Sequence, residues 1–164
     1  MFRLKALTMR QPWAECIRTK GRNVENRSWS TKYRGWIAVH TSTAKIRNEF
    51  ELCRLLHGSD FKEADLAAGV IIGFVKITDV IQKETVTEKT KTWFQGEYGF
   101  VIEDFLPLPI PIKVKGAMGL WVLEGDALKQ CLDQLISSEF AKISESLTEA
   151  HTAQVTEKLV LSVG

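Results

Sequence analysis

The stretch GVIIGFVKITDVI, residues 69–81, is the clearest strand signal in this chain of 164 residues. It is rich in β-branched residues and apolar on both of its faces, which is typical of a strand buried within a sheet. Lys76 interrupts it, and no apolar run reaches the roughly 18 residues that a membrane helix needs. The sequence therefore predicts a buried strand here and no membrane association.

Shorter stretches on both sides of residues 69–81 also carry strand patterns. Residues 106–111 contain three prolines at alternate positions, which excludes a central strand but fits the edge of a sheet. Five or six short strands with two early helices predict an α+β fold, either a small mixed β-barrel or a strongly curved sheet. The other strands are expected at residues 3–9, 23–29, 36–40, 98–103 and 119–123.

Two helices are expected among the first sixty residues. One begins at Pro12, whose missing N–H suits a first helical turn, and stops at Gly21. The second follows Thr41, Ser42 and Thr43, which can cap its first turn. Its apolar positions recur at helical spacing and are Ile46, Phe50, Cys53 and Leu56.

The pattern changes at residue 126, and no glycine or proline occurs from 127 to 163. An apolar stripe at helical spacing predicts one long helix or a helical pair. We therefore expect a barrel domain over residues 1–125 and a helical extension over 126–164. The extension packs on the barrel or on a second copy, so both a monomer and a homodimer are open. The stripe is formed by Leu128, Cys131, Leu132, Leu135, Ile136, Phe140, Ile143 and Leu147.

Three cysteines lie far apart in the sequence and form no C-x-x-C pair. This argues against a zinc site and against a disulfide framework, and it predicts buried, reduced thiols. We therefore expect no metal, no cofactor and an intracellular, cytoplasmic location. The first residues carry scattered charges, which is unlike a signal peptide. The cysteines are Cys16, Cys53 and Cys131.

Positive charge is concentrated at the start of the chain. Residues 1–47 hold 11 Lys or Arg but only Glu15 and Glu25 as acids, whereas the whole chain has a net charge of +2. Such asymmetry is typical of a surface that faces a polyanion. Because residues distant in sequence intermix on a folded surface, charge alone leaves RNA, DNA and no nucleic acid all open.

Tryptophans alternate with cations between residues 9 and 42. Cations neutralise phosphates and release counterions, and aromatic faces stack on unpaired bases. Alternatively, each tryptophan belongs to the core and each arginine is solvated surface. The interleaving favours a binding surface, with phosphates on arginines and a base on an indole. The candidate residues are Arg10, Trp13, Arg22, Arg27, Trp29 and Arg34.

Glu25 is an isolated carboxylate among cations and shares a strand face with Arg27. It can accept a hydrogen bond from the amino group of a base, or polarise a water as a catalytic acid or base. It can equally form a structural ion pair between a strand and a helix, and both interpretations remain open. His40 ends a strand, where it can titrate or serve as a hydrogen-bonded structural residue.

Several of these segments resemble the ASCH domain. They are residues 11–14 (QPWA), 21–29 (GRNVENRSW), 33–35 (YRG) and 39–42 (VHTS), with later matches at 69–80, 98–100 and 116–121. The family hallmark is G-x-K-x-x-E-x-R. Aligned on Arg27, Arg22 takes the lysine position and Lys20 the first-glycine position. The resemblance covers roughly residues 4–124.

The resemblance implies a PUA-like β-barrel whose helices flank a cleft lined by the hallmark residues. It implies RNA or nucleotide binding, and it adds His40 and Ser42 to the ligand-binding candidates. Some members are amidohydrolases acting on N-acetylcytidine through a lysine, a threonine and a glutamate, and others are ribonucleases. Here Arg22 and Glu25 replace that lysine and threonine, and an arginine does not readily become a neutral base.

We therefore predict a module that binds a nucleotide or single-stranded RNA in a basic, tryptophan-containing cleft. One alternative is a hydrolase acting on a modified nucleoside or RNA, with Glu25 as its acid or base. Another is an interaction protein that uses its C-terminal helix.

Overall fold

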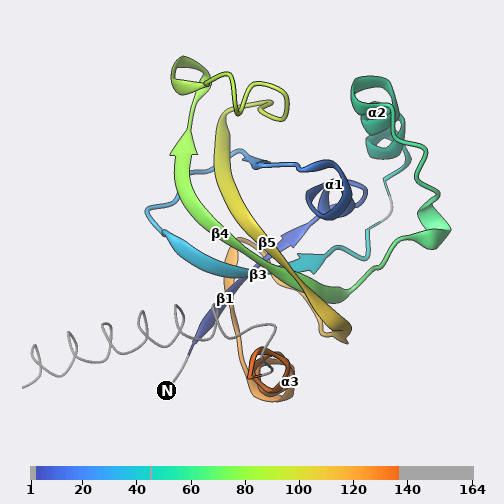
Figure 1. The fold of residues 1–164 in the computed structure, drawn as a ribbon, viewed down its shortest axis with the longest axis vertical. Helices are drawn as coiled ribbons and strands as arrows, with labels where there is room; N and C mark the ends of the chain where they lie inside the picture. The colour runs from blue at the N-terminus through green and yellow to red at the C-terminus, as the bar shows by residue number, and fades with distance from the viewer. Residues whose placement is uncertain (1–2, 45, 137–164) are drawn as a thin grey trace, which may run out of the picture.

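The computed structural model describes residues 3–44 and 46–136 (Figure 1). Its strands are β1 (Leu4–Met9), β2 (Val24–Arg27), β3 (Gly35–Thr41), β4 (Val70–Ile81), β5 (Tyr98–Lys113) and β6 (Leu120–Leu123). Its α-helices are α1 (Trp13–Lys20), α2 (Arg47–His57) and α3 (Gly125–Leu135). The predicted α+β class is confirmed.

All six strands belong to one sheet in the order β2-β5-β4-β3-β1-β6. β1 and β3 are parallel, whereas the other neighbouring pairs are antiparallel, so the sheet is mixed as predicted. The pairing of β4 with β5 shifts register at three points. Such irregularities bend and twist a strand, and they account for the strong curvature of these two strands in Figure 1.

β4 corresponds to the predicted buried strand and pairs with β3 on one side and β5 on the other. Phe74 and Ile77 are fully buried, and Val75 is nearly so. Lys76, which interrupts the apolar run, is exposed. The apolar, β-branched composition thus identified the centre of the sheet correctly.

β5 is longer than the sequence predicts, because residues 98–103 and the proline-rich stretch form one strand of 16 residues. β2 pairs with it only from Tyr98 to Val101. Within the described residues, the proline-rich half has β4 on one side and no strand on the other. Since a proline has no N–H to offer to a second neighbour, the edge position predicted from the prolines is confirmed.

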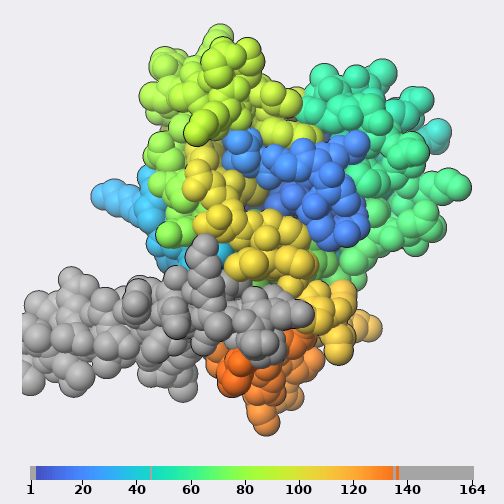
Figure 2. Space-filling view, viewed as in Figure 1, coloured from blue at the N-terminus to red at the C-terminus, as the bar shows by residue number. Residues whose placement is uncertain are grey.

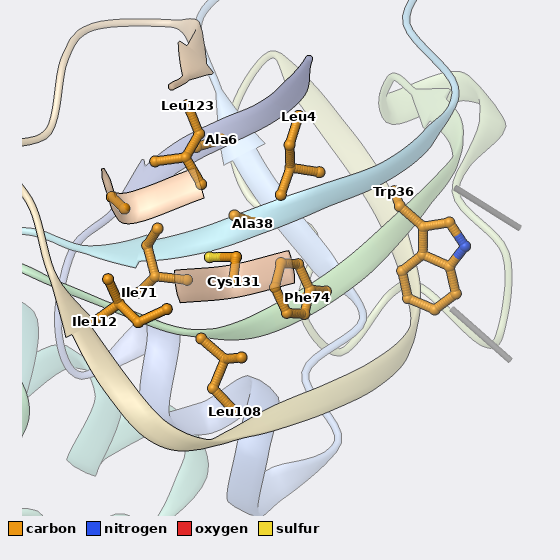
Figure 3. Packing of buried hydrophobic residues seen from close by; sticks show 11 residues of the cluster. Leu4, Ala6, Trp36, Ala38, Ile71, Phe74, Leu108, Ile112, Leu123 and Cys131 are labelled. Atoms are coloured by element: carbon orange, nitrogen blue, oxygen red, sulfur yellow. The ribbon is translucent and has the colours of Figure 1, made fainter. Parts of the chain in front are cut away.

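The sheet packs on both of its faces. Along β3, Trp36 and Ala38 belong to one buried cluster, and Ile37 and Val39 to another, as the alternation of side chains in a strand requires. Figure 3 shows the first cluster, which Cys131 of α3 joins. The second cluster includes Ala14 and Ile17 of α1. Trp36 therefore serves the core and not a ligand surface.

Both early helices end at glycines. Gly21 and Gly58 have φ angles of 65° and 62°, a left-handed conformation that favours glycine. The stop at Gly21 is confirmed. The predicted cap of α2 is wrong, because Ile46 occupies the N-cap in an extended conformation. Thr41 instead ends β3, where its hydroxyl bonds to the backbone of Val70.

α3 is the part of the predicted helical extension that the structure describes. Ala127 and Cys131 are buried in the first cluster. The side-chain amide of Gln134 donates to the carbonyl of Ile110 at 2.9 Å and accepts from its N–H at 3.1 Å. The rest of the predicted stripe and any homodimer contact through it lie outside the described residues. No helix in the described ranges combines the length and apolarity that crossing a membrane requires.

Candidate functional site

A cleft of about 760 Å³ opens beside α1 and α2, which lie side by side in Figure 2 as the blue and green-teal surfaces. Such a volume is typical of small-molecule sites. Its walls come from β1, β2, both helices and the loops that precede β5 and β6. The lining residues are Thr8, Arg10, Trp13, Arg22, Glu25, Asn26, Arg27, Ser28, Trp29, Ser42, Glu49, Leu52, His57, Trp93, Gln95, Ala117, Met118 and Gly119.

Three hallmark residues meet in the cleft as a triad, which is Arg22, Glu25 and Arg27. Arg22 Nη1 donates to Glu25 Oε2 at 2.5 Å. Arg27 donates to the other oxygen, Oε1, from Nε at 3.1 Å and from Nη2 at 2.9 Å. The Glu25 side chain is 7% exposed, and those of Arg22 and Arg27 are 4% and 20% exposed. β2 and the turn after α1 thus place two guanidinium groups around one carboxylate.

The triad carries one positive charge more than its carboxylate neutralises. Arg22 Nε is buried without a hydrogen-bond partner, while Arg27 Nη2 also donates to the carbonyl of Thr8 at 2.6 Å. A buried charge is costly unless it is paired. The triad therefore favours an anion in the cleft beside it, and the carboxylate holds both arginines in position.

Two tryptophans stand next to these arginines. The Arg22 guanidinium lies 5.5 Å from the ring centroid of Trp13, and that of Arg27 lies 6.0 Å from Trp29. Trp29 and Phe100 form a T-shaped pair with ring centroids 5.1 Å apart and an interplanar angle of 78°. Both indoles are only half-buried, so each offers apolar surface to the cleft next to a cation.

The helix α2 and the loop before β5 bring residues that the sequence interpretation missed. His57 stacks on Trp93 with centroids 3.9 Å apart and meets Trp13 edge-on at 6.0 Å. Burial lowers the pKa of His57, and the charges of Arg22 and Lys20 lower it further. The neutral imidazole thus extends the aromatic wall. The available signal was a Trp93-Phe94 pair within an otherwise polar loop.

Glu49 is the second acid of the cleft. Its carboxylate accepts from Arg10 Nη1 at 3.1 Å and from Trp13 Nε1 at 2.6 Å. Ser28 and Gln95 add exposed polar side chains to the wall. Glu49 lies just beyond the basic segment in sequence, so local charge counting did not associate it with the site.

The predicted site residues differ in whether they line the cleft. Arg34 is outside the cleft, where it donates to the carbonyls of Thr31 and Tyr33 and lies 3.6 Å from Asp79. Ser42 lines the cleft, and its hydroxyl accepts from the N–H of Ala44. Arg10, Trp13, Trp29 and the triad all line the cleft together.

His40 lies behind the cleft and is only 2% exposed. Its Nε2 bonds to the carbonyl of Val114 at 2.8 Å, and its Nδ1 lies 3.1 Å from the Thr8 hydroxyl. Since a carbonyl only accepts, Nε2 carries a proton, while the Thr8 hydroxyl also donates to the carbonyl of Ala117 at 3.3 Å. Burial lowers the pKa of His40. Trp121 and His40 form a T-shaped pair with ring centroids 5.6 Å apart. His40 is therefore a structural residue that packs against Thr8 of β1.

Within the described ranges, no three His, Cys, Asp or Glu side chains are grouped so that they could hold a metal ion. The lining of the cleft presents guanidinium groups, carboxylates and aromatic rings.

The sequence pattern of the ASCH domain matches residues 7–111, which is more than half of the chain, so the chain belongs to the ASCH domain family. It is 28% identical over 127 residues to activating signal cointegrator 1 of Mus musculus and of Homo sapiens. The match covers 72% of this chain and 22% of those proteins, so the chain spans about a fifth of their length. A crystal structure of ASCH from Zymomonas mobilis is similar with a TM-score of 0.47 and 13% identity, over 79% of this chain and 93% of that one.

Proposed function

We propose that the cleft binds a nucleotide or a short segment of single-stranded RNA. The observation that carries this proposal is the triad, whose net positive charge lies next to two half-buried tryptophans in a cleft of about 760 Å³. A phosphate bound beside Arg22 and Arg27 compensates the positive charge that Glu25 leaves over, and guanidinium groups bind phosphate through charge-assisted hydrogen bonds. A base then reaches the face of Trp13 or Trp29, because stacking needs only an accessible ring.

Binding accounts for the position of Glu25 better than hydrolysis does. Each oxygen of its carboxylate already accepts a hydrogen bond from an arginine, at 2.5 Å and 2.9 Å. A general base needs a free lone pair directed at the proton that it removes. Three arginine N–H groups fill three of the about four acceptor positions of this carboxylate, so a nucleoside or RNA hydrolase would have to work through the position left on Oε2.

We expect the protein to act inside the cell, where RNA and free nucleotides occur. The three cysteines are free, buried thiols, which suits a reducing compartment such as the cytoplasm.

Titration of the intrinsic tryptophan fluorescence tests the proposal. Cytidine and adenosine monophosphates and a single-stranded hexaribonucleotide are added at about 50 mM salt, and for RNA the affinity is expected to fall as salt rises. Arg27→Ala is expected to weaken binding at least about tenfold, because charge-assisted bonds to phosphate are lost. Arg34→Ala is the matched control, since Arg34 lies outside the cleft.

Two outcomes would contradict the proposal: no binding by the folded wild-type protein, or equal weakening by both arginine variants. The same samples are incubated with N-acetylcytidine and with RNA, and the products are separated by chromatography. Turnover that is lost in Glu25→Gln, under conditions in which circular dichroism shows that this variant is folded, would favour the hydrolase instead.

A further inference from the structure

We propose that the Glu49 carboxylate of α2 competes with a phosphate of the ligand for the hydrogen-bond donors of Arg10 and Trp13. Its carboxylate occupies a second oxyanion subsite, formed by the donors of Arg10 and Trp13 and separate from the triad. The inference rests on the proposed function for the class of ligand, a nucleotide or single-stranded RNA. It assigns to Glu49 a role in setting affinity and salt dependence.

The geometry of this subsite is that of an oxyanion held by two donors. Glu49 Oε1 accepts from Arg10 Nη1 at 3.1 Å, and Oε2 accepts from Trp13 Nε1 at 2.6 Å. Guanidinium and indole N–H groups donate and cannot accept. Either a carboxylate or a phosphate can therefore serve as their acceptor, and a ligand phosphate can bind both donors only after Glu49 has left them.

The two subsites differ in their access to water. The Arg10 and Glu49 side chains are 59% and 22% exposed, whereas those of Arg22 and Glu25 are 4% and 7% exposed. An exposed ion pair is screened by solvent and exchanges partners at little cost, whereas a buried pair does not. Glu49 can therefore be displaced by an incoming anion while the triad stays intact.

The helix that carries Glu49 has one buried residue, and at its end His57 stacks on Trp93. Cys53 is the single buried residue of α2, and its Sγ lies 3.4 Å from that of Cys16 in α1. Glu49 lies one turn before Cys53, so both face α1. Leu55 on the same helix is 77% exposed. A change of the Glu49 side-chain rotamer frees the two donors without any movement of α2.

The test compares Glu49→Gln with Glu51→Gln in the full chain. Both remove one negative charge from α2, but Glu51 is 52% exposed, pairs with Arg47 at 3.5 Å and does not line the cleft. The glutamine at position 49 keeps an acceptor for Trp13, and thermal unfolding verifies that each variant is folded. The probes are adenosine monophosphate, a single-stranded hexaribonucleotide and inorganic phosphate.

We expect Glu49→Gln to bind the nucleotide and the RNA roughly three- to tenfold more tightly than the wild type and than Glu51→Gln. The slope of log K against log salt for RNA should become steeper by about 0.7, the value of one added phosphate contact on a single strand. For inorganic phosphate, the readout is the ¹⁵N–¹H resonance of the Trp13 indole. It should shift at lower phosphate concentration in Glu49→Gln than in Glu51→Gln.

The outcomes separate this inference from the proposed function. If RNA and nucleotide bind but the two variants behave alike, the proposed function stands and the competitor role of Glu49 is wrong. If neither RNA nor nucleotide binds to any protein, the proposed function fails. In that case the phosphate titration alone decides, because a Trp13 shift specific to Glu49→Gln supports the subsite and an equal response overturns it.

Discussion

Glu25 and Glu49 face the same cleft and both bind arginine, but they are built into the protein in opposite ways. Glu25 lies on the strand β2 and is nearly buried, and each of its carboxylate oxygens accepts a hydrogen bond from a guanidinium group. Glu49 lies on a helix with one buried residue and shares its oxygens between an exposed arginine and an indole. Burial and the number of cationic partners thus separate a positioning carboxylate from a replaceable one.

The largest expected effect is on Glu25. Glu25→Gln leaves two arginines with an uncompensated charge in a buried place, so it should lower the free energy of unfolding by about 3–5 kcal/mol. Urea denaturation followed by circular dichroism measures this loss. A loss under about 1 kcal/mol would mean that solvent already screens the triad, and the contrast between the two carboxylates would disappear.

The second prediction compares the buried His40 of β3 with His57 at the end of α2. Burial lowers the pKa of both His40 and His57 below the usual value of about 6.5. The unfolded chain therefore binds more protons than the folded one as pH falls below about 6.5, and stability is lost toward pH 5. Urea denaturation at pH 7.5, 6 and 5 measures the loss.

Substitutions identify which histidine is responsible. His40→Gln keeps a donor for the Val114 carbonyl but does not titrate, so the loss between pH 7.5 and 5 should shrink. His57→Gln should reduce it less, because His57 is partly exposed at the end of α2 whereas His40 is 2% exposed. A larger effect at His57 would show that α2 is held more firmly than the single buried cysteine indicates.

The smallest effect on stability is expected at Glu49. Glu49→Gln removes an ion pair with an arginine that is 59% exposed, and such pairs contribute about 0–1 kcal/mol. The free energy of unfolding should therefore fall by less than about 1 kcal/mol in the same urea experiment. A loss as large as that of Glu25→Gln would make Glu49 a structural anchor of α2.

Local patterns predicted the elements of the fold well. The β-branched run of β4, the prolines of β5 and the glycine after α1 each constrain the backbone through their own chemistry, so their meaning depends little on distant residues. The prediction for the start of α2 was wrong because the Thr41 hydroxyl finds its partner in Val70. That partner is 29 residues away, and no local pattern reveals it.

The grouping of the candidate residues in one cleft could be predicted in part, for the same reason. Arg22, Glu25 and Arg27 lie within six residues of one another, so spacing and family resemblance could place them together. Glu49, His57 and Trp93 come from a separate helix and a distant loop. A hydrogen bond joins the loop that contains Trp93 to β2, because the side-chain amide of Asn26 donates to the carbonyl of Trp93 at 2.8 Å.

The sequence by itself determined the α+β class, the buried centre of the sheet and the basic, tryptophan-rich character of one segment. These follow from composition and periodicity, which act over a few residues. Only the tertiary structure decided that Trp36 packs in the core, that Arg34 and His40 lie outside the cleft, and that Glu25 is held between two arginines. Burial and ion pairing depend on which distant segments meet, and the packing of the sheet and its helices settles that.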